Sequence, residues 1–143
     1  MEHTELSREC IERLCEKAVE MRQKSYVPYS HFRVGAALLT EGGEIFTGCN
    51  VENAAFTPGN CAERTAIFKA VSEGHLRFAA IAISGGPEEG DLQYCPPCGV
   101  CRQVMAEFCS GDFPIYLAKS AADYEAHTLE ELLPMRFTPD NLK

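Results

Sequence analysis

Apolar residues recur at helical spacing in three segments of the chain, and a turn signal closes each segment. The first segment ends before the turn-forming residues 26–29, and glycines, which favour helix C-termini, stop the other two. The segments are residues 6–19, residues 62–73 before Gly74, and residues 100–108 before Gly111. We expect three amphipathic helices, each with an apolar face toward a core.

A hairpin pattern follows the first helix. Residues 32–40 favour a strand, and two adjacent glycines at 42–43 favour a tight turn into a second strand, residues 45–52. Because side chains alternate along a strand, the period of two places Asn50 and Glu52 on one face. The polar pair is therefore a candidate for joint binding.

Two further strands lie between and after the remaining helices. Residues 78–83 form a continuous apolar run, which is typical of a buried central strand, and residues 115–118 form a shorter run. Alternating helices and strands predict an α/β fold in which helices cover both faces of the sheet, an α/β/α sandwich.

The composition favours one compact domain over residues 1–143. The chain has 143 residues, 45% of them hydrophobic, which is enough for a real core. We find no basic, apolar leader at the N-terminus, and apolar runs such as residues 78–83 are too short to span a bilayer. We therefore expect a cytoplasmic protein without a membrane partner.

The charge of the chain narrows the choice of partner. A net charge of −8 argues against binding a nucleic acid polymer, because such binding depends on clustered Lys and Arg that neutralise phosphates. The chain also has no Gly-rich cradle or Arg cluster for phosphate near Asn50 and Glu52. A neutral amide with a carboxylate suits the hydroxyls of a sugar, so we expect a small neutral substrate.

The cysteines carry the clearest chemistry. Eight cysteines in a reducing compartment more often bind metal than form disulfides. Cys61 opens the second predicted helix with Glu63 two residues on, while Cys98 and Cys101 open the third and share a helix face. Three thiolates are the protein ligands that a catalytic zinc ion (Zn²⁺) needs when water takes its fourth position. Helix N-termini would lower the pKa of these thiols.

Two structural alternatives apply to this cluster. Glu63 follows Asn60 at the spacing of a capping box, so it could serve only to cap the helix. Cys95 precedes Cys98 by three residues, so four cysteines could form a closed structural site. The remaining cysteines are expected to pack as small apolar residues: Cys10, Cys15, Cys49 and Cys109.

Several motifs in order resemble the small, homotetrameric, zinc-dependent cytidine deaminases, within the superfamily whose signature is H-x-E followed by P-C-x-x-C. Here a cysteine, Cys61, stands where many members have His. The matching segments are FRVGAAL at 32–38, GCNVENA at 48–54, CAERTA at 61–66 and PCGVC at 97–101. The resemblance runs from about Tyr29 to Phe137 and implies a mixed sheet of about five strands.

The resemblance also implies roles for individual residues. Zinc would be held by the three motif cysteines, and Glu63 would shuttle protons. Asn50 and Glu52 would bind the ribose hydroxyls, Phe32 would lie against the pyrimidine, and the backbone at Ala62 would contact the base. Phe137 would either help to cover the ring or only anchor the C-terminal tail. Many members of the family have a Tyr that reaches the active site of a neighbouring subunit, and Phe56 stands at that position here.

The substrate implied is a small nucleoside rather than a nucleotide. The activity implied is the hydrolysis of cytidine and deoxycytidine to uridine and deoxyuridine with release of ammonia, in a homotetramer with shared active sites. A blasticidin S deaminase resembles this family in fold and metal site and is the closest alternative. A polynucleotide-editing deaminase shares the chemistry but normally has a basic surface, and a non-catalytic zinc module would not need Glu63.

Arg64 is a candidate for tuning the metal. Three thiolates around a divalent zinc ion leave the centre with a net negative charge, whereas one His and two thiolates would leave it neutral. Arg64 lies three residues after Cys61, hence on the same helix face, so its guanidinium can donate to that sulfur. The alternative is a solvated surface arginine.

Overall fold

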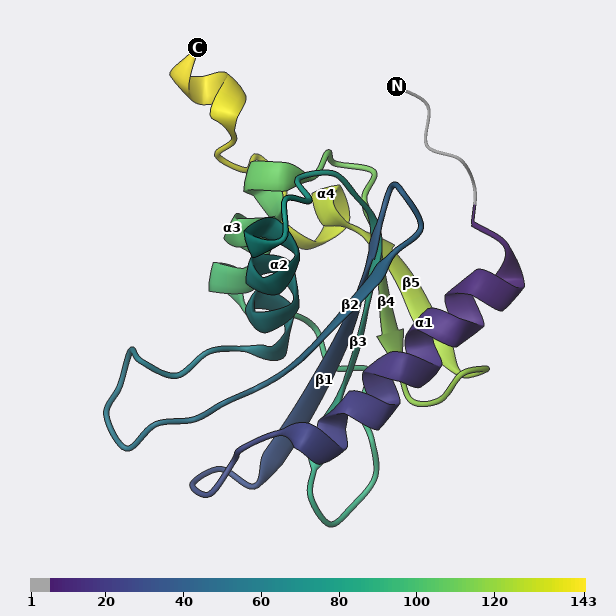
Figure 1. The fold of residues 1–143 in the computed structure, drawn as a ribbon, viewed down its shortest axis with the longest axis vertical. Coiled ribbons are helices and arrows are strands. Elements are labelled where there is room, and N and C mark those ends of the chain that lie inside the picture. The colour runs from purple at the N-terminus through teal and green to yellow at the C-terminus, as the bar shows by residue number, and fades with distance from the viewer. Residues whose placement is uncertain (1–5) are drawn as a thin grey trace.

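The computed structural model describes residues 6–143, which build a five-stranded sheet with the strand order β2-β1-β3-β4-β5 (Figure 1). β3 and β4 are parallel and the other neighbours are antiparallel, so the sheet is mixed, as expected. The strands are β1 (Phe32–Thr40), β2 (Ile45–Cys49), β3 (Phe78–Pro87), β4 (Pro114–Ala118) and β5 (Tyr124–Thr128).

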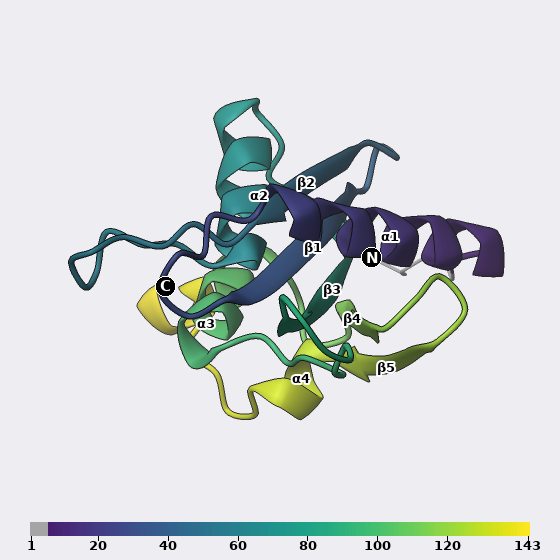
Figure 2. The same ribbon diagram turned by 90° about the horizontal axis from the view of Figure 1, so that it is seen from below.

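Helices cover both faces of this sheet, as Figures 1 and 2 show. One core cluster joins α1 to β1, β3 and β4, and the other joins α2, α3 and α4 to the opposite face of the same strands. The helices are α1 (Arg8–Met21), α2 (Ala62–Ser72), α3 (Gly99–Phe108) and α4 (Leu129–Leu132), with 3-10 turns at Arg22–Lys24 and Pro139–Leu142. The predicted three-layer α/β/α sandwich is confirmed.

The local sequence explains where the first helix lies. Ser7 caps α1, since its side-chain oxygen accepts from the backbone N–H of Cys10 at 3.1 Å. Leu14, Cys15 and Ala18 are fully buried on one face of α1, against β1, β3 and β4. The predicted apolar stripe is therefore the face that contacts the sheet.

Close packing of α2 on β2 positions the start of the metal helix. A Cβ atom at Gly48 would lie 2.5 Å from both Ala62 O and Ala66 N, so only glycine permits this approach. Gly74 ends the helix region with φ +94°, and the backbone N–H groups of Gly74 and His75 bond back to Val71 and Ala70. Both ends of the predicted second helix are thus confirmed to within a few residues.

The prediction was wrong about the end of the second strand. β2 stops at Cys49 rather than at residue 52, so Asn50 and Glu52 follow the strand instead of sharing one of its faces. The reason is that the Asn50 side chain, in place of the backbone of the next residues, bonds to β1. Val51 then pairs with Asn60 to close the base of a long loop that projects from the molecule (Figures 1 and 2).

Other boundaries also differ from the sequence prediction. β3 continues to Pro87, beyond the predicted residue 83, and the sequence patterns did not single out β5 or α4. Within residues 6–143, no helix combines the length and apolar character needed to cross a membrane.

Candidate active site

Three cysteine sulfurs meet where α2 and α3 begin. Cys61 is the N-cap of α2, Cys98 is the N-cap of α3, and Cys101 lies in the first turn of α3. Cys61 Sγ lies 3.7 Å from Cys98 Sγ, which lies 3.5 Å from Cys101 Sγ, and all three atoms fall within 4.8 Å of one another. Sulfurs bound tetrahedrally to zinc at ~2.3 Å are about 3.8 Å apart, so this cluster fits the ion.

The surroundings of the cluster favour the thiolate form of Cys61. The pKa of Cys61 is lowered to about 5, chiefly by a hydrogen bond from Cys101, with Arg64 adding to the effect against the opposing cost of burial. The pKa of Cys101 is raised, first because its proton is held in the bond to Cys61 and then by burial. Cys61 and Cys98 are the N-caps of α2 and α3, and the positive end of a helix dipole favours an anion at that position.

Arg64 contacts the cluster as its sequence position predicted. Its Nη2 atom donates to Cys61 Sγ at 3.3 Å, and the bond to Cys61 is the main reason why the pKa of Arg64 is raised. Arg64 is partly buried, and its Nε atom is buried without a hydrogen-bond partner among residues 6–143. The contact and burial contradict the alternative of a solvated surface arginine.

Glu63 lies buried beside the sulfurs, two residues into α2. Its side chain is 4% exposed, and burial raises the pKa of its carboxyl to about 7. The capping alternative is wrong, because the N-cap is Cys61 and no side chain caps this helix. Asn60 instead donates from Nδ2 to Thr65 Oγ1 at 3.3 Å. A buried carboxyl with a pKa near neutrality can both take and give a proton.

The closed four-cysteine site is also not what the geometry shows. Among the described residues, the cluster that could hold a metal contains Cys61, Cys98 and Cys101 without Cys95. Cys95 packs against Gly85, where an added Cβ atom would lie 2.7 Å from its sulfur. The other cysteines pack as expected. Cys15 on α1 is buried against the sheet, and Cys10 and Cys109 lie beside the two core clusters. Cys49, the last residue of β2, is partly buried.

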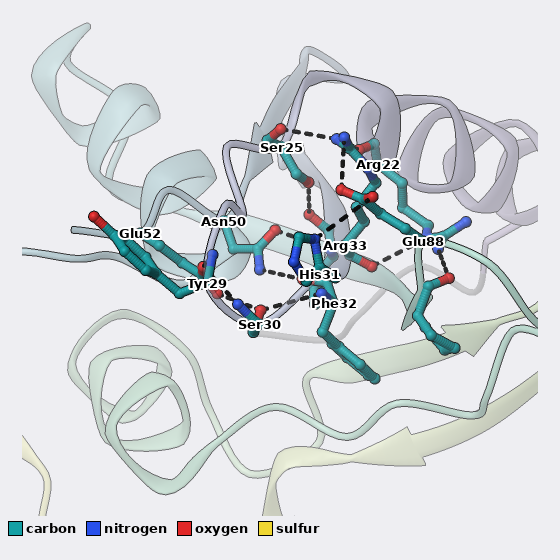
Figure 3. A network of polar contacts seen from close by, with 12 residues as sticks. Arg22, Ser25, Tyr29, Ser30, His31, Phe32, Arg33, Asn50, Glu52 and Glu88 are labelled. Atoms are coloured by element: carbon teal, nitrogen blue, oxygen red, sulfur yellow. Dashed lines mark hydrogen bonds and ion pairs between the residues drawn. The ribbon is translucent and has the colours of Figure 1, made fainter. Parts of the chain in front are cut away.

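Asn50 fastens the end of β2 to the start of β1 (Figure 3). Its Nδ2 atom donates to Phe32 O at 2.9 Å, and its Oδ1 atom accepts from Val34 N at 2.9 Å. These two bonds leave one amide hydrogen and one oxygen lone pair for other partners. Asn50 therefore stabilises the hairpin, and it also lines the groove described below.

Glu52 binds the loop before β1. Its Oε1 atom accepts from the backbone N–H groups of Tyr29 and Ser30, both at 3.1 Å, and its Oε2 atom accepts a short hydrogen bond from the Ser30 hydroxyl. The Ser30 hydroxyl is the leading cause that lowers the pKa of Glu52, with the two backbone bonds adding to it. Glu52 is thus held as a carboxylate at the groove's edge.

A groove of about 910 Å³ runs between the projecting loop and the starts of α2 and α3. The structure brings four of the predicted site residues to its walls, and they are Asn50, Glu52, Cys61 and Arg64. Ser30 and Val100 also line it. The groove therefore joins the sulfur cluster to the two polar residues that follow β2.

Three other predicted residues lie elsewhere. The ring of Phe32 points away from the polar network in Figure 3, and Ala62 is buried as the first residue of α2. Phe137 is 55% exposed, in the C-terminal segment that Gln103 holds by a hydrogen bond to the Phe137 carbonyl at 2.8 Å. Within this chain, Phe137 does not line the groove.

Two residues near the site were missed by the sequence analysis. Ser30 links Glu52 to Phe32, and the local signal was a serine two residues before Phe32, the spacing of a side-chain turn. Arg102 donates from Nε to Pro97 O at 2.8 Å and also bonds to Leu132 O. It follows Cys101 directly and fixes the backbone just before Cys98.

Comparison with known families agrees with this site. A family model described as the cytidine and deoxycytidylate deaminase zinc-binding region matches residues 8–117, which include all the cysteines of the cluster. The chain therefore belongs to the cytidine and deoxycytidylate deaminase family, and zinc is the cofactor of that family's matched region.

Within that family, the chain is similar to proteins described as cytidine deaminases. The one from Sporosarcina psychrophila is 49% identical over 132 residues, which cover 92% of this chain and 94% of the relative. The one from Halalkalibacterium halodurans is 46% identical over 129 residues, 90% of this chain and 95% of the relative. A blasticidin-S deaminase from Bacillus cereus is more distant, at 33% identity over 129 residues.

Solved structures show the same fold. The crystal structure of cytidine deaminase from Burkholderia pseudomallei is 45% identical with a TM-score of 0.77, covering 87% of this chain and 97% of that one. Cytidine deaminase from Mycobacterium tuberculosis is 32% identical with a TM-score of 0.74, covering 93% and 98%. The similarity confirms that fold and family agree along almost the whole chain.

Proposed function

We propose that the protein is a zinc-dependent cytidine deaminase that hydrolyses cytidine and deoxycytidine to uridine and deoxyuridine with release of ammonia. The observation that carries this proposal is the buried Glu63 carboxyl beside three thiols in a chain of the cytidine deaminase family. Cytidine deaminases at 49% and 46% identity favour this activity over that of the blasticidin-S deaminase at 33%.

Cys61, Cys98 and Cys101 hold the zinc ion in this proposal. Their sulfur spacing fits the ion, and three protein ligands leave one position open, as catalytic zinc sites require. The chemistry that zinc supplies when bound is Lewis acidity, which makes the attacking water easier to deprotonate near neutral pH.

Glu63 moves the protons of the reaction. Its carboxylate takes a proton from the attacking water as the water oxygen adds to C4 of the cytosine ring. The protonated carboxyl then gives that proton to N3, and a second transfer from the added hydroxyl to the exocyclic amine lets ammonia leave. The oxygen remains as the uracil carbonyl. A pKa of about 7 suits Glu63 to both directions of transfer.

The sugar binds at Asn50 and Glu52, and the base lies near Phe32 and the backbone of Ala62. The two polar residues line one groove with Cys61, and this shared groove supports a sugar site beside the cluster. The backbone of Asn50 and Glu52 pairs with Tyr26, so both side chains start from a fixed main chain. Their contacts inside this chain leave free hydrogen-bonding capacity for a sugar.

The active protein is a homotetramer with shared active sites. Phe56 at the tip of the projecting loop is fully exposed, and Met135 and Phe137 also expose apolar surface. Such surface on a loop beside the groove suits contact with another copy of this chain, which would also bring a neighbour's Phe137 to the ring. We further propose that residues 1–143 form one domain and that the protein works in the cytoplasm without a nucleic acid polymer or membrane as partner.

The test is direct. Purified protein is incubated with cytidine, and conversion of its ultraviolet spectrum to that of uridine is followed alongside ammonia release. Blasticidin S serves as the competing substrate under the same conditions. Turnover of cytidine with a higher kcat/KM than for blasticidin S supports the proposal, and the reverse preference contradicts it.

A further inference from the structure

The hydroxyl of Ser30 lies between two residues proposed to contact different parts of the substrate. It donates to Glu52 Oε2, on the sugar side, and its oxygen accepts from the backbone N–H of Phe32 at 3.1 Å (Figure 3). A hydroxyl is both donor and acceptor, so one small group makes both bonds. Alanine could make neither.

Contacts other than the bond from Ser30 already restrict the position of Glu52. Its backbone N–H donates to Tyr26 O at 2.9 Å, and its Oε1 atom already accepts from two backbone N–H groups. A carboxylate offers about four acceptor positions, so Oε2 keeps one for a further donor. The Ser30 hydroxyl therefore sets the orientation of the carboxylate oxygen that remains open.

The loop that contains Ser30 is fixed by other bonds as well. His31, at φ +56°, donates from its backbone N to Val27 O at 3.1 Å and accepts at its carbonyl from Glu88 N at 2.7 Å. Because these contacts do not involve the Ser30 side chain, the loop can keep its course when the hydroxyl is removed. Ser30 itself is exposed and lines the groove.

We propose that Ser30 is a positioning residue that holds Glu52 Oε2 for a hydroxyl of the sugar and ties this oxygen to the backbone of Phe32. The inference rests on the proposed deaminase function. In this role Ser30 sets the preference for substrates that carry ribose hydroxyls and leaves the chemical step to other residues. The lowered pKa of Glu52, caused first by Ser30, agrees with a carboxylate kept ready to accept.

The experiment compares Ser30→Ala with the unchanged protein on cytidine and on 2′,3′-dideoxycytidine, which lacks the two sugar hydroxyls that Glu52 is proposed to bind. We expect kcat/KM for cytidine to fall about tenfold, mainly through KM, the size of one lost hydrogen bond to a charged group. For dideoxycytidine we expect little change. An equal fall on both substrates overturns the proposal, because it indicates general damage to the site.

Two further variants separate the two bonds of Ser30. Ser30→Thr keeps the hydroxyl and should show the same preference for cytidine over dideoxycytidine as the unchanged protein. Ser30→Asp keeps an acceptor for Phe32 N–H, as in an Asx turn, but places a like charge beside Glu52. It should fold and lose the preference, and it serves as the test if the alanine variant does not fold. An unchanged preference in Ser30→Asp overturns the proposal.

A matched control variant and a double-mutant cycle accompany these variants. Ser120 makes the same kind of side-chain turn far along the chain, because its hydroxyl accepts from the N–H groups of Ala122 and Asp123. Ser120→Ala should therefore leave kcat/KM unchanged for both substrates. Combining Ser30→Ala with Glu52→Gln should cost less than the sum of the two single effects on cytidine, and additive losses overturn the proposal. Failure of the unchanged protein to deaminate cytidine would instead reject the proposed function.

Discussion

Asn50 and Phe32 are joined by a hydrogen bond of 2.9 Å from the Asn50 side-chain amide to the Phe32 carbonyl oxygen. The same amide accepts from Val34 N, so one side chain continues the ladder between β1 and β2 after β2 has ended. A residue proposed to bind the sugar therefore also holds the open end of the β1–β2 hairpin, where β1 begins and β2 ends. Its loss should affect both stability and binding.

The first prediction concerns that double role. Asn50→Ala should lower the free energy of unfolding by about 1–3 kcal/mol, because the partly buried Val34 N–H loses its side-chain acceptor. It should also raise KM for cytidine. Urea unfolding and initial rates measure the two effects. Gln23→Ala removes an exposed amide in the turn after α1 and should leave both unchanged. A fully stable Asn50→Ala protein would contradict the structural part.

The second prediction is that the purified protein holds one zinc ion per chain through Cys61, Cys98 and Cys101. Elemental analysis should show loss of zinc from the alanine variant of each, since every one removes a ligand from a three-thiol cluster. Cys95→Ala is the control and should keep its zinc, because that sulfur packs against Gly85. Loss of zinc from Cys95→Ala would show that the ligand set is wrong.

The third prediction tests Glu63 as the proton carrier. Glu63→Gln keeps the shape of the side chain but cannot take a proton, so kcat should fall by at least ~10²-fold while zinc stays bound. Glu73→Gln, an exposed change just after α2, should be neutral. Steady-state kinetics with zinc analysis on the same samples distinguishes lost chemistry from lost metal. Nearly normal turnover would remove Glu63 from the mechanism.

The sequence predicted the parts of the fold whose side chains follow a clear period. The stripe of Leu14, Cys15 and Ala18 and the apolar run at 78–83 both correspond to buried faces. β5 was missed because it is an edge strand in which no residue is fully buried, so it shows no apolar alternation. α4 has four residues, too few for a helical period to emerge.

The site shows a similar division. The Cys98–Cys101 pair and the contact between Arg64 and Cys61 follow from spacing on single helices, whereas the approach of Cys61 to that pair joins two helices that are separated in sequence. The end of β2 at Cys49 could not be predicted, because it depends on Asn50 reaching residues 16 and 18 positions away in sequence. The role of Ser30 likewise depends on Glu52, which is 22 residues away.

The fourth prediction concerns assembly. Sedimentation at assay concentration should show a species of four times the 15.8 kDa of one chain. Phe56→Ser should weaken the assembly and the activity together, because it removes the fully exposed aromatic side chain from the projecting loop. Phe68→Ser, at a half-exposed position on α2, serves as a comparison. A fully active monomer would reject the shared sites.

The last prediction comes from the charge of the metal centre. Three thiolates leave zinc with a net negative charge, which makes the attacking water harder to deprotonate, and Arg64 offsets this by donating to Cys61 Sγ at 3.3 Å. Arg64→Gln should therefore lower kcat far more than it raises KM. Arg13→Gln, an exposed arginine on α1, is the control.

The double variant Arg64→Gln with Cys61→His decides between tuning and a merely structural role for Arg64. A neutral His in place of a thiolate removes the excess negative charge that Arg64 offsets, so the double variant should recover part of the kcat that Arg64→Gln loses. Zinc content must be the same in all four proteins of the cycle for the comparison to hold. If the two losses simply add, the guanidinium does not act on the charge of the cluster, and its bond to Cys61 only holds the start of α2.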